Sequence, residues 1–483
     1  MPQYLYDTDQ MHAWEQRWVS QHGDVEGLIK QVAWSFANYL DDQIFENKQK
    51  IAVWCGKGNN AGDGYYTALY LKQKGHDVDI YAVPLHETSH LVPIQGHVQK
   101  TLCVYHHFDV LRDYDVYIDA LFGLGLNRPL DQTSQQLVEK FNQQKGFKIA
   151  LDIPTGLNAN TGAVMPCAIH ADLTLTSIAY KTGLFTGQAK DYIGKLHLTV
   201  LIPEDELLIP QAQLAPAQMR RPQRMQTAHK GSNGHVLIVG GHASLGGAVM
   251  MAAEAAYATG AGKVTVVCHA QHHQAILARS PNVMVQDIET LTQEAVEELL
   301  HQVDTVSFGM GLGRDEWGEH YYDFWLHSFK RCPHLHITLD ADALWFLANS
   351  NQQLNTHYYL TPHSGEAARL LDCTVQIIEQ NRYKAIHQLK QKYGGSWVLK
   401  GAGSLVLEDA LWVCTAGNAG MATAGMGDVL AGMISGLKGQ TDIALHDIVT
   451  LHAQAGDLLA QSGQQGIQAY QMPEAIYKVL NAV

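Results

Sequence analysis

The first forty residues carry apolar side chains at helical spacing. Over residues 8–19 the apolar positions recur every three to four residues, and Thr8 stands where an N-cap is expected. Residues 27–40 continue with the same period. This pattern predicts two helices in this part of the chain.

From residue 51 onward the pattern changes to short apolar runs that are typical of buried strands. Each run ends in a polar or glycine-bearing loop, and helical segments lie between the runs. The first series covers residues 51–54, 78–83, 116–118, 148–151 and 173–176. The second series covers residues 235–239, 264–268, 305–308, 337–339, 358–360 and 397–399. Such alternation predicts an α/β fold with mainly parallel sheets, whose ligands bind beyond the carboxyl ends of the strands.

The segment between the two series, residues 202–228, contains four prolines and many glutamines but no clear strand or long helix pattern. A chain of 483 residues is long enough for two or three domains. We therefore expect one domain at residues 1–205, a linker at 206–224 and a second domain at 225–483.

The composition indicates a folded protein that avoids polyanions. Apolar residues make up 46% of the chain and charged residues 17%, which excludes a mainly disordered chain. The 33 basic and 47 acidic residues give a charge of −14, which opposes binding to nucleic acid or to anionic membranes. No apolar run approaches the length of about 18 residues that a membrane span needs, and the first residues lack the features of a secretory signal. The seven cysteines are scattered without a C-x-x-C pair, which indicates reduced thiols and a cytoplasmic location, and the 26 histidines lack zinc-ligand spacing.

A glycine-rich segment, residues 56–64, follows the first expected strand and precedes a helix expected over residues 65–74. Glycines let backbone N–H groups approach a ligand closely, and a following helix N-terminus favours an anion, so the segment indicates phosphate binding. It matches neither the P-loop nor the G-x-G-x-x-G pattern. Asp119 and Asp152 each end a later strand. Together with Asn60 and Thr155 they supply oxygen donors for a cation, and the alternative is that each aspartate caps its loop.

In the second half of the chain, residues 425–428 form a glycine-rich turn before an apolar helical segment. Such a turn exposes free N–H groups to an anion, and Asp428 at the helix start can act as a general base on a substrate hydroxyl. A capping role for Asp428 is the alternative. Lys400 and His363 lie just beyond two expected strands, which favours a ligand site.

Four motifs in the first half together resemble the NAD(P)HX epimerase domain, a Rossmann-like fold that interconverts the R and S forms of hydrated NADH or NADPH. The motifs stand at residues 59–64, 119–123, 152–156 and 181–184, and the similarity spans most of residues 1–200. The resemblance implies that the hydrated dinucleotide is bound by Asn59, Asn60, Ala61, Gly62, Asp63, Gly123, Leu124, Gly125, Leu126, Asn127, Arg128, Pro129 and Asp152. It further implies that Asn60, Asp119 and Thr155 bind potassium. We expect Asp152 to transfer the proton in epimerisation.

Eight motifs in the second half resemble the ADP-dependent NAD(P)HX dehydratase, which has a ribokinase-like fold. They follow in the expected order over residues 225–480, from 229–231 to 425–428. The resemblance implies that ADP is bound by Lys400, Gly401, Ala402, Gly403, Ser404 and Gly427. It implies that the hydrated nicotinamide nucleotide is bound by Ala248, Gly311, His363 and Asp428.

Together the two resemblances imply a bifunctional nicotinamide nucleotide repair enzyme with a Rossmann-like three-layer domain followed by a ribokinase-like three-layer domain. ADP would phosphorylate the hydroxyl of the S hydrate with Asp428 as the base, and elimination would restore NADH or NADPH. We expect Mg²⁺ to bridge the phosphates, K⁺ to bind in the first domain, and the chain to form a homo-oligomer.

Two other functions are consistent with the sequence. A ribokinase-type small-molecule kinase that uses ATP would share the glycine-rich turn and Asp428. The first domain could also be a nucleotide-binding module without catalysis, because Lys30, Ala33 and Ala61 depart from the pattern of the epimerase family.

Overall fold

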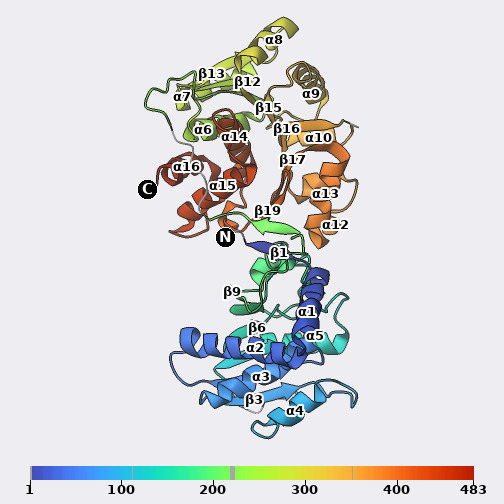
Figure 1. Cartoon of the computed structure of the whole chain (residues 1–483). Coiled ribbons are helices and arrows are strands. Elements are labelled where there is room, and N and C mark those ends of the chain that lie inside the picture. The colour runs from blue at the N-terminus through green and yellow to red at the C-terminus, as the bar shows by residue number, and fades with distance from the viewer. Residues whose placement is uncertain (1–2, 111, 218–223, 351, 483) are drawn as a thin grey trace. The chain divides into compact units, whose positions relative to one another are not determined.

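The computed structural model describes residues 3–110, 112–217, 224–350 and 352–482. The chain divides into two compact units, Met1–Gln213 and Leu214–Val483, which we call unit 1 and unit 2 (Figure 1). Residues 218–223 of the expected linker lie outside the described residues. The expectation that residues 202–228 hold no strand is wrong, because β10 (Ala212–Leu214) forms there.

Unit 1 is built on a parallel sheet of seven strands in the order β4-β3-β2-β5-β6-β7-β9. The strands are β2 (Lys50–Cys55), β3 (Asp77–Ala82), β4 (Val104–Tyr105), β5 (Val116–Ala120), β6 (Phe147–Leu151), β7 (Leu173–Ser177) and β9 (Lys195–Thr199). All five strands predicted here are confirmed. In the same unit a short strand, β1 (Tyr4–Tyr6), pairs with β8 (Tyr180–Lys181).

Helices cover both faces of this sheet, which gives three layers. The helices are α1 (Thr8–His22), α2 (Val25–Tyr39), α3 (Asn59–Gln73), α4 (Val92–Val98) and α5 (Gln132–Asn142). Side chains alternate along β2, so that Ile51 and Val53 join the core with α2 and α3, whereas Trp54 joins the core with Phe141 of α5. Apolar side chains on both faces are what a parallel sheet between two helical layers requires.

Two helix starts in unit 1 differ from the predictions. The N-cap of α1 is Asp7 and not Thr8, because the Asp7 carboxylate accepts the N–H of Gln10 at 2.8 Å and the Gln10 side chain accepts the N–H of Asp7 at 3.1 Å. Helix α3 begins at Asn59, so the loop expected to reach residue 64 is shorter. A Cβ at Gly64 would lie 2.5 Å from the Cβ of Ala120, so this glycine serves close packing of α3 on β5.

Unit 2 has a larger sheet in the order β13-β12-β11-β14-β15-β16-β17-β18-β19, parallel from β13 to β17 and antiparallel at β18 and β19. The strands are β11 (His235–Val239), β12 (Lys263–Cys268), β13 (Met284–Asp287), β14 (Thr305–Phe308), β15 (His336–Leu339), β16 (Leu354–Leu360), β17 (Gly394–Leu399), β18 (Ser404–Leu407) and β19 (Leu411–Cys414). The six strands predicted in this half are confirmed.

Helices flank this sheet on both sides (Figure 1). They are α6 (Gly246–Ala258), α7 (His273–Arg279), α8 (Gln293–Gln302), α9 (Glu316–Phe329), α10 (Asp342–Leu347), α11 (Ser364–Leu370), α12 (Val375–Gln380), α13 (Arg382–Tyr393), α14 (Met426–Lys438), α15 (Leu445–Ala460) and α16 (Met472–Asn481). Helix α14 lies against α6, and a Cβ at Gly432 would lie 2.1 Å from the carbonyl oxygen of Ala252. Among the described residues we find no helix with the length and apolar character of a membrane span.

Candidate functional site

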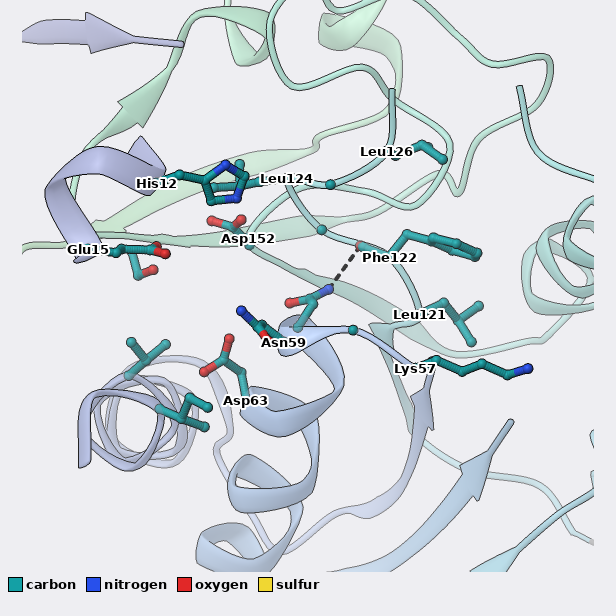
Figure 2. A pocket seen from close by; sticks show the side chains of 18 of the residues that line it. His12, Glu15, Lys57, Asn59, Asp63, Leu121, Phe122, Leu124, Leu126 and Asp152 are labelled. Carbon is teal, nitrogen blue, oxygen red and sulfur yellow. Dashed lines mark hydrogen bonds between the residues drawn. The ribbon is translucent and has the colours of Figure 1, made fainter. Parts of the chain in front are cut away.

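Unit 1 contains a cavity of about 1040 Å³ at the carboxyl ends of its strands. Its wall is formed by the loops that follow β2, β5, β6 and β7, together with helices α1 and α2 (Figure 2). A cavity of this volume is large enough for a dinucleotide-sized ligand. This is the place that the strand pattern predicted for a ligand.

Most of the predicted substrate-binding residues lie on the wall of this cavity. They are Asn59, Asn60, Asp63, Gly123, Leu124, Gly125, Leu126, Arg128 and Asp152. Four others are not on the wall, namely Ala61, Gly62, Asn127 and Pro129. The methyl group of Ala61 is fully buried in the core shared by α2 and α3, so it does not face a ligand.

Helix α1 supplies cavity residues that the sequence analysis missed. His12 and Glu15 lie one turn apart and face the cavity, whereas Met11 and Trp14 are buried on the other side of the helix (Figure 2). The signal was present in the sequence, because the amphipathic period of residues 8–19 also fixes which polar positions share the opposite face.

Asn60, Asp119 and Thr155 come together beside the cavity. The Thr155 hydroxyl donates to Asp119 Oδ1 at 2.7 Å, and the N–H of Thr155 donates to Asp119 Oδ2 at 2.8 Å. Asn60 Nδ2 donates to the carbonyl of Phe122 at 2.9 Å, which leaves Asn60 Oδ1 buried without a partner among the described residues (Figure 2). Asp119 is completely buried, and this burial raises its pKa to about 6. A buried amide oxygen without a donor, beside a carboxylate and a hydroxyl, fits a bound cation.

Asp152 is held by a buried lysine. Lys181 Nζ donates to Asp152 Oδ1, to the Thr176 hydroxyl at 2.8 Å and to the carbonyl of Ser177 at 2.9 Å. Asp152 also adopts a φ of +65°, a conformation that side chains other than glycine rarely take. Strain of this kind at a cavity wall is typical of functional residues.

Two further carboxyl groups, those of Glu15 and Asp63, point into the cavity near Asp152 (Figure 2). Burial raises the pKa of Glu15, and the charge of Asp152 raises it further. Burial also raises the pKa of Asp63 well above its usual range, and the charges of Asp152 and Glu15 add to this effect. This end of the cavity therefore holds carboxyl groups that are suited to proton transfer.

Unit 2 presents a second site at the N-terminus of α14. Gly425 is the N-cap with a φ of +92°, and Asp428 lies in the first helical turn, as the sequence predicted. A Cβ at Gly427 would lie 3.1 Å from Lys400 Nζ and 3.2 Å from Asp340 Oδ2, so Gly427 leaves the helix start open toward Lys400 and Asp340. Free N–H groups beside a lysine ammonium favour the binding of a phosphate.

Charged side chains crowd this second site. Lys400 Nζ lies 2.9 Å from Asp340 Oδ1 and 3.8 Å from Glu366 Oε2. Burial raises the pKa of Asp428 to about 7, with a further contribution from the charge of Asp340. Burial likewise raises the pKa of Glu366 to about 7. A carboxyl group with a pKa near neutrality is suited to general-base catalysis.

The other predicted residues of unit 2 lie at strand ends. His363 is exposed and caps α11, where its Nδ1 accepts the N–H of Gly365 at 3.0 Å. Gly311 has a φ of +64°, and a Cβ there would lie 3.4 Å from the Cβ of Ala248. In the turn that joins β17 to β18, the Ser404 hydroxyl donates to the carbonyl of Gly401 at 3.0 Å. This turn also contains Lys400, Gly401, Ala402 and Gly403.

The sequence predicted no role for Asp340 or Glu366. Both lie beyond the carboxyl ends of strands, Asp340 directly after β15 and Glu366 in α11 after β16. Only 2% of the surface of Asp340 is exposed, and its carboxylate accepts a hydrogen bond from the Thr361 hydroxyl at 2.8 Å. A strand-end position was the available signal, but only the fold shows that both carboxylates meet at Lys400.

Family models match both units. Residues 236–478 match the family described as NAD(P)H-hydrate dehydratase, and residues 25–183 match the family described as YjeF-related protein N-terminus. The two matches follow each other along the chain, as the two units do.

Curated relatives cover both units in one chain. The chain is 36% identical over 500 residues to the bifunctional NAD(P)H-hydrate repair enzyme Nnr of Vibrio cholerae, which covers 100% of this chain and 99% of the relative. It is 37% identical over 449 residues to the Escherichia coli protein of the same name, with 89% and 84% covered.

One solved structure supports the fold of unit 2. A ribokinase-like superfamily protein from Enterococcus faecalis matches 54% of this chain and 91% of its own chain, with 28% identity and a TM-score of 0.50.

Proposed function

This chain belongs to the family of bifunctional NAD(P)H-hydrate repair enzymes, and from this premise we propose that its two units carry out two linked reactions. Unit 1 interconverts the R and S hydrates of NADH and NADPH. Unit 2 removes water from the S hydrate with ADP as the phosphoryl donor. The observation that supports this most is the presence of two separate strand-end sites, one lined by carboxyl groups and one built around Lys400 and the start of α14.

In unit 2 the hydroxyl of the hydrate is a poor leaving group until it is phosphorylated. Asp428 takes the proton from this hydroxyl, because its raised pKa makes it a base near neutral pH. The N–H groups at the start of α14 and the Lys400 ammonium stabilise the charge of the phosphoryl group during transfer. ADP lies along the turn of residues 400–404 and against Gly427, and the hydrate lies against Ala248, Gly311 and His363.

Mg²⁺ in unit 2 would neutralise phosphate charge. It is commonly held by one or two carboxylates together with phosphates and water. Asp340 and Glu366 offer carboxylates beside Lys400 at the phosphate end of the site, so the residues present fit this ion.

In unit 1 Asp152 accepts a proton while the configuration at the hydroxyl-bearing carbon of the hydrate is inverted. The buried Lys181 ammonium contacts the Asp152 carboxylate and holds it at the cavity wall. We propose that K⁺ is held by Asn60, Asp119 and Thr155, because the buried Asn60 Oδ1 otherwise has no partner among the described residues. The ion would fix the Phe122 loop beside the substrate.

We also propose that the enzyme works in the cytoplasm as a homo-oligomer. All seven cysteines are free thiols, as expected in a reducing compartment. Trp34 on α2 is 48% exposed and is the kind of apolar side chain that a contact between subunits would cover. Light scattering of the purified protein measures the oligomeric state.

The proposed function is tested with a mixture of R and S hydrates of NADH, with and without ADP and Mg²⁺, by recovery of dihydronicotinamide absorbance. Complete recovery, faster than spontaneous epimerisation allows, is the expected result. Recovery that stops at the S fraction would contradict the role of unit 1. ATP-dependent phosphorylation of another small alcohol, without recovery, would identify the chain as a kinase instead.

A further inference from the structure

Helix α1 is held rigidly against the rest of unit 1. Its capping box is closed by Asp7 and Gln10, and its buried face packs Trp14 edge-on against Tyr6 with ring centroids 5.3 Å apart. Trp14 Nε1 donates to the carbonyl of Pro203 at 3.1 Å. Because one face is fixed in this way, the other face presents Glu15 to the cavity in a defined position.

Glu15 has no hydrogen bond or ion pair with any other described residue. The same holds for Asp63 within the described ranges, whereas Asp152 is held by Lys181. These three carboxyl groups come from different elements, α1, α3 and the loop after β6, and meet at one end of the cavity (Figure 2). Burial raises the pKa of both Glu15 and Asp63, so each keeps its proton to a higher pH than an exposed carboxyl group does.

The cavity has an opposite end of different charge. Lys57 lies on the wall away from Glu15 and Asp63 (Figure 2). Arg128 also lines the cavity, and its charge acts together with that of Lys57 on the Asp131 carboxylate. Although the Asp131 carboxylate also lines this end, Lys57 and Arg128 give it the net positive charge that would receive the pyrophosphate of a dinucleotide, with the hydrated ring toward the three carboxyl groups.

We propose that Glu15 is a second catalytic residue of the epimerase site and supplies the proton that the departing hydroxyl takes from the enzyme. This inference rests on the proposed function of unit 1. The groups that face Glu15 are His12 on its own helix, Asp63 of α3, and Asp152 with Lys181. Asp152 thus acts as the base and Glu15 as the acid.

The chemistry balances with these two groups alone. Water adds to the enamine double bond of a dihydronicotinamide ring with its oxygen on the carbon next to the ring nitrogen. When that C–O bond breaks, the oxygen takes a proton from Glu15 and leaves as water, while the nitrogen lone pair forms a C=N⁺ bond. Water then adds to the other face of this carbon and gives a proton to Asp152. Transfer of that proton from Asp152 to Glu15 restores the starting state.

The test uses the full chain with Glu15→Gln and measures conversion of R to S hydrate without ADP, so that unit 2 is idle. We expect kcat to fall at least about 100-fold with a much smaller change in KM, and Glu15→Asp to recover part of the rate. The wild-type rate should fall as the pH rises through the pKa of Glu15, and Glu15→Gln should lose this dependence. Dehydration of pure S hydrate with ADP by the same samples reports that the chain is intact.

Asp9→Asn is the matched control, because it removes one carboxylate from the exposed side of the same helix. It should leave the conversion rate unchanged. A Glu15→Gln rate within about 3-fold of the wild-type rate, or a change confined to KM, would overturn the proposal. If the wild-type chain does not speed the conversion at all, the proposed function of unit 1 is wrong. If the wild type is active and Glu15→Gln is equally active, only the role of Glu15 is wrong.

Discussion

At the residue scale, the second site shows how several carboxyl groups around one lysine raise the pKa of Asp428. Asp340, Glu366 and Asp428 share the single ammonium group of Lys400, which contacts the first two. Burial and mutual repulsion therefore raise the pKa of Asp428 to about 7. A base with this pKa is mostly ionised just above neutral pH and still basic enough to take a proton from a hydroxyl.

The first prediction concerns the activity of Asp428. Because a base must be ionised, the rate of S-hydrate dehydration should rise with pH up to about 7 and then level off. Asp428→Asn should lower kcat at least about 100-fold without affecting epimerisation. Initial rates with ADP and Mg²⁺ across this pH range measure both effects. A flat pH profile together with an active Asp428→Asn variant would contradict the role of Asp428 as base.

The second prediction concerns stability at the same residue. With a raised pKa, folded Asp428 binds more protons than the unfolded chain between about pH 4 and 7, so the free energy of unfolding falls as the pH rises through this range. Asp428→Asn should therefore stabilise unit 2 by about 1 kcal/mol or more at about pH 8, and by less at about pH 5. Thermal unfolding at both pH values measures the difference. If Asp428→Asn changed the melting temperature equally at both pH values, the carboxylate of Asp428 would not be a destabilising buried charge.

The third prediction concerns potassium. Because Asn60 Oδ1 is buried without a partner among the described residues, K⁺ should speed epimerisation, while choline at the same ionic strength should not. Thr155→Val removes the hydroxyl that bonds Asp119 and should abolish the response to K⁺. Rates of R-to-S conversion over a KCl titration provide the measurement. A Thr155→Val variant with the wild-type response would place the ion elsewhere.

Sequence motifs predicted the position of a residue in the fold where the motif itself marks the end of a helix. Asp428 lies in the first turn of α14 as predicted, because glycines at 425 and 427 mark that start. Glu15 was missed, since an amphipathic helix carries polar residues on its outer face in any case. Only the fold shows that this face borders a cavity.

At the element scale, glycines set how closely helices approach the sheets. Helix α3 begins at Asn59 and runs across Gly62 and Gly64, although the glycine-rich string predicted a longer loop. Glycine lowers helix propensity, but here the absence of a side chain lets α3 lie directly on β5. Tertiary packing thus outweighed the local signal, whereas all eleven apolar runs that predicted strands do form strands.

The fourth prediction tests this packing with Gly64→Ala. The new Cβ would lie 2.5 Å from the Cβ of Ala120 and 3.0 Å from Cys55 Sγ, so α3 must shift. We expect unit 1 to lose about 1–3 kcal/mol of stability and much of its epimerase rate, while dehydration is unchanged. Gly96→Ala in α4 is the control, because nothing lies within 4 Å of its Cβ. Equal unfolding temperatures for the two variants would refute the packing argument.

At the scale of the whole molecule, the two sites are built from residues of different units. Among the described residues, those that line the cavity of unit 1 fall within 12–178, and the site at α14 is built from residues of unit 2. The division into two α/β halves followed from the two series of apolar runs. The short strands β4 and β8 were not predicted, because two residues are too few to show a period.

The fifth prediction follows from the placement of the two sites in different units. Asp152→Asn should stop recovery at the S fraction, and Asp428→Asn should stop it altogether. A mixture of the two variants should again recover all of an R and S mixture, because the hydrate can leave one chain and enter another. Dihydronicotinamide absorbance over time measures this. A mixture that stops at the S fraction, when the wild type does not, would show that both sites must lie on one chain.

The hydrogen bond between Trp14 and Pro203 affects when unit 1 can complete its fold during synthesis. The two residues are 189 positions apart, and Arg17 reaches Asp205 at 2.5 Å in the same way. At elongation rates of about 5–20 residues per second, α1 leaves the ribosome roughly 10–40 s before its anchor exists. Until then Trp14 and Arg17 lack their partners Pro203 and Asp205, and a chaperone can bind the apolar face of α1. Helix α1, which forms part of the cavity wall, is therefore made well before the residues that fix it in place.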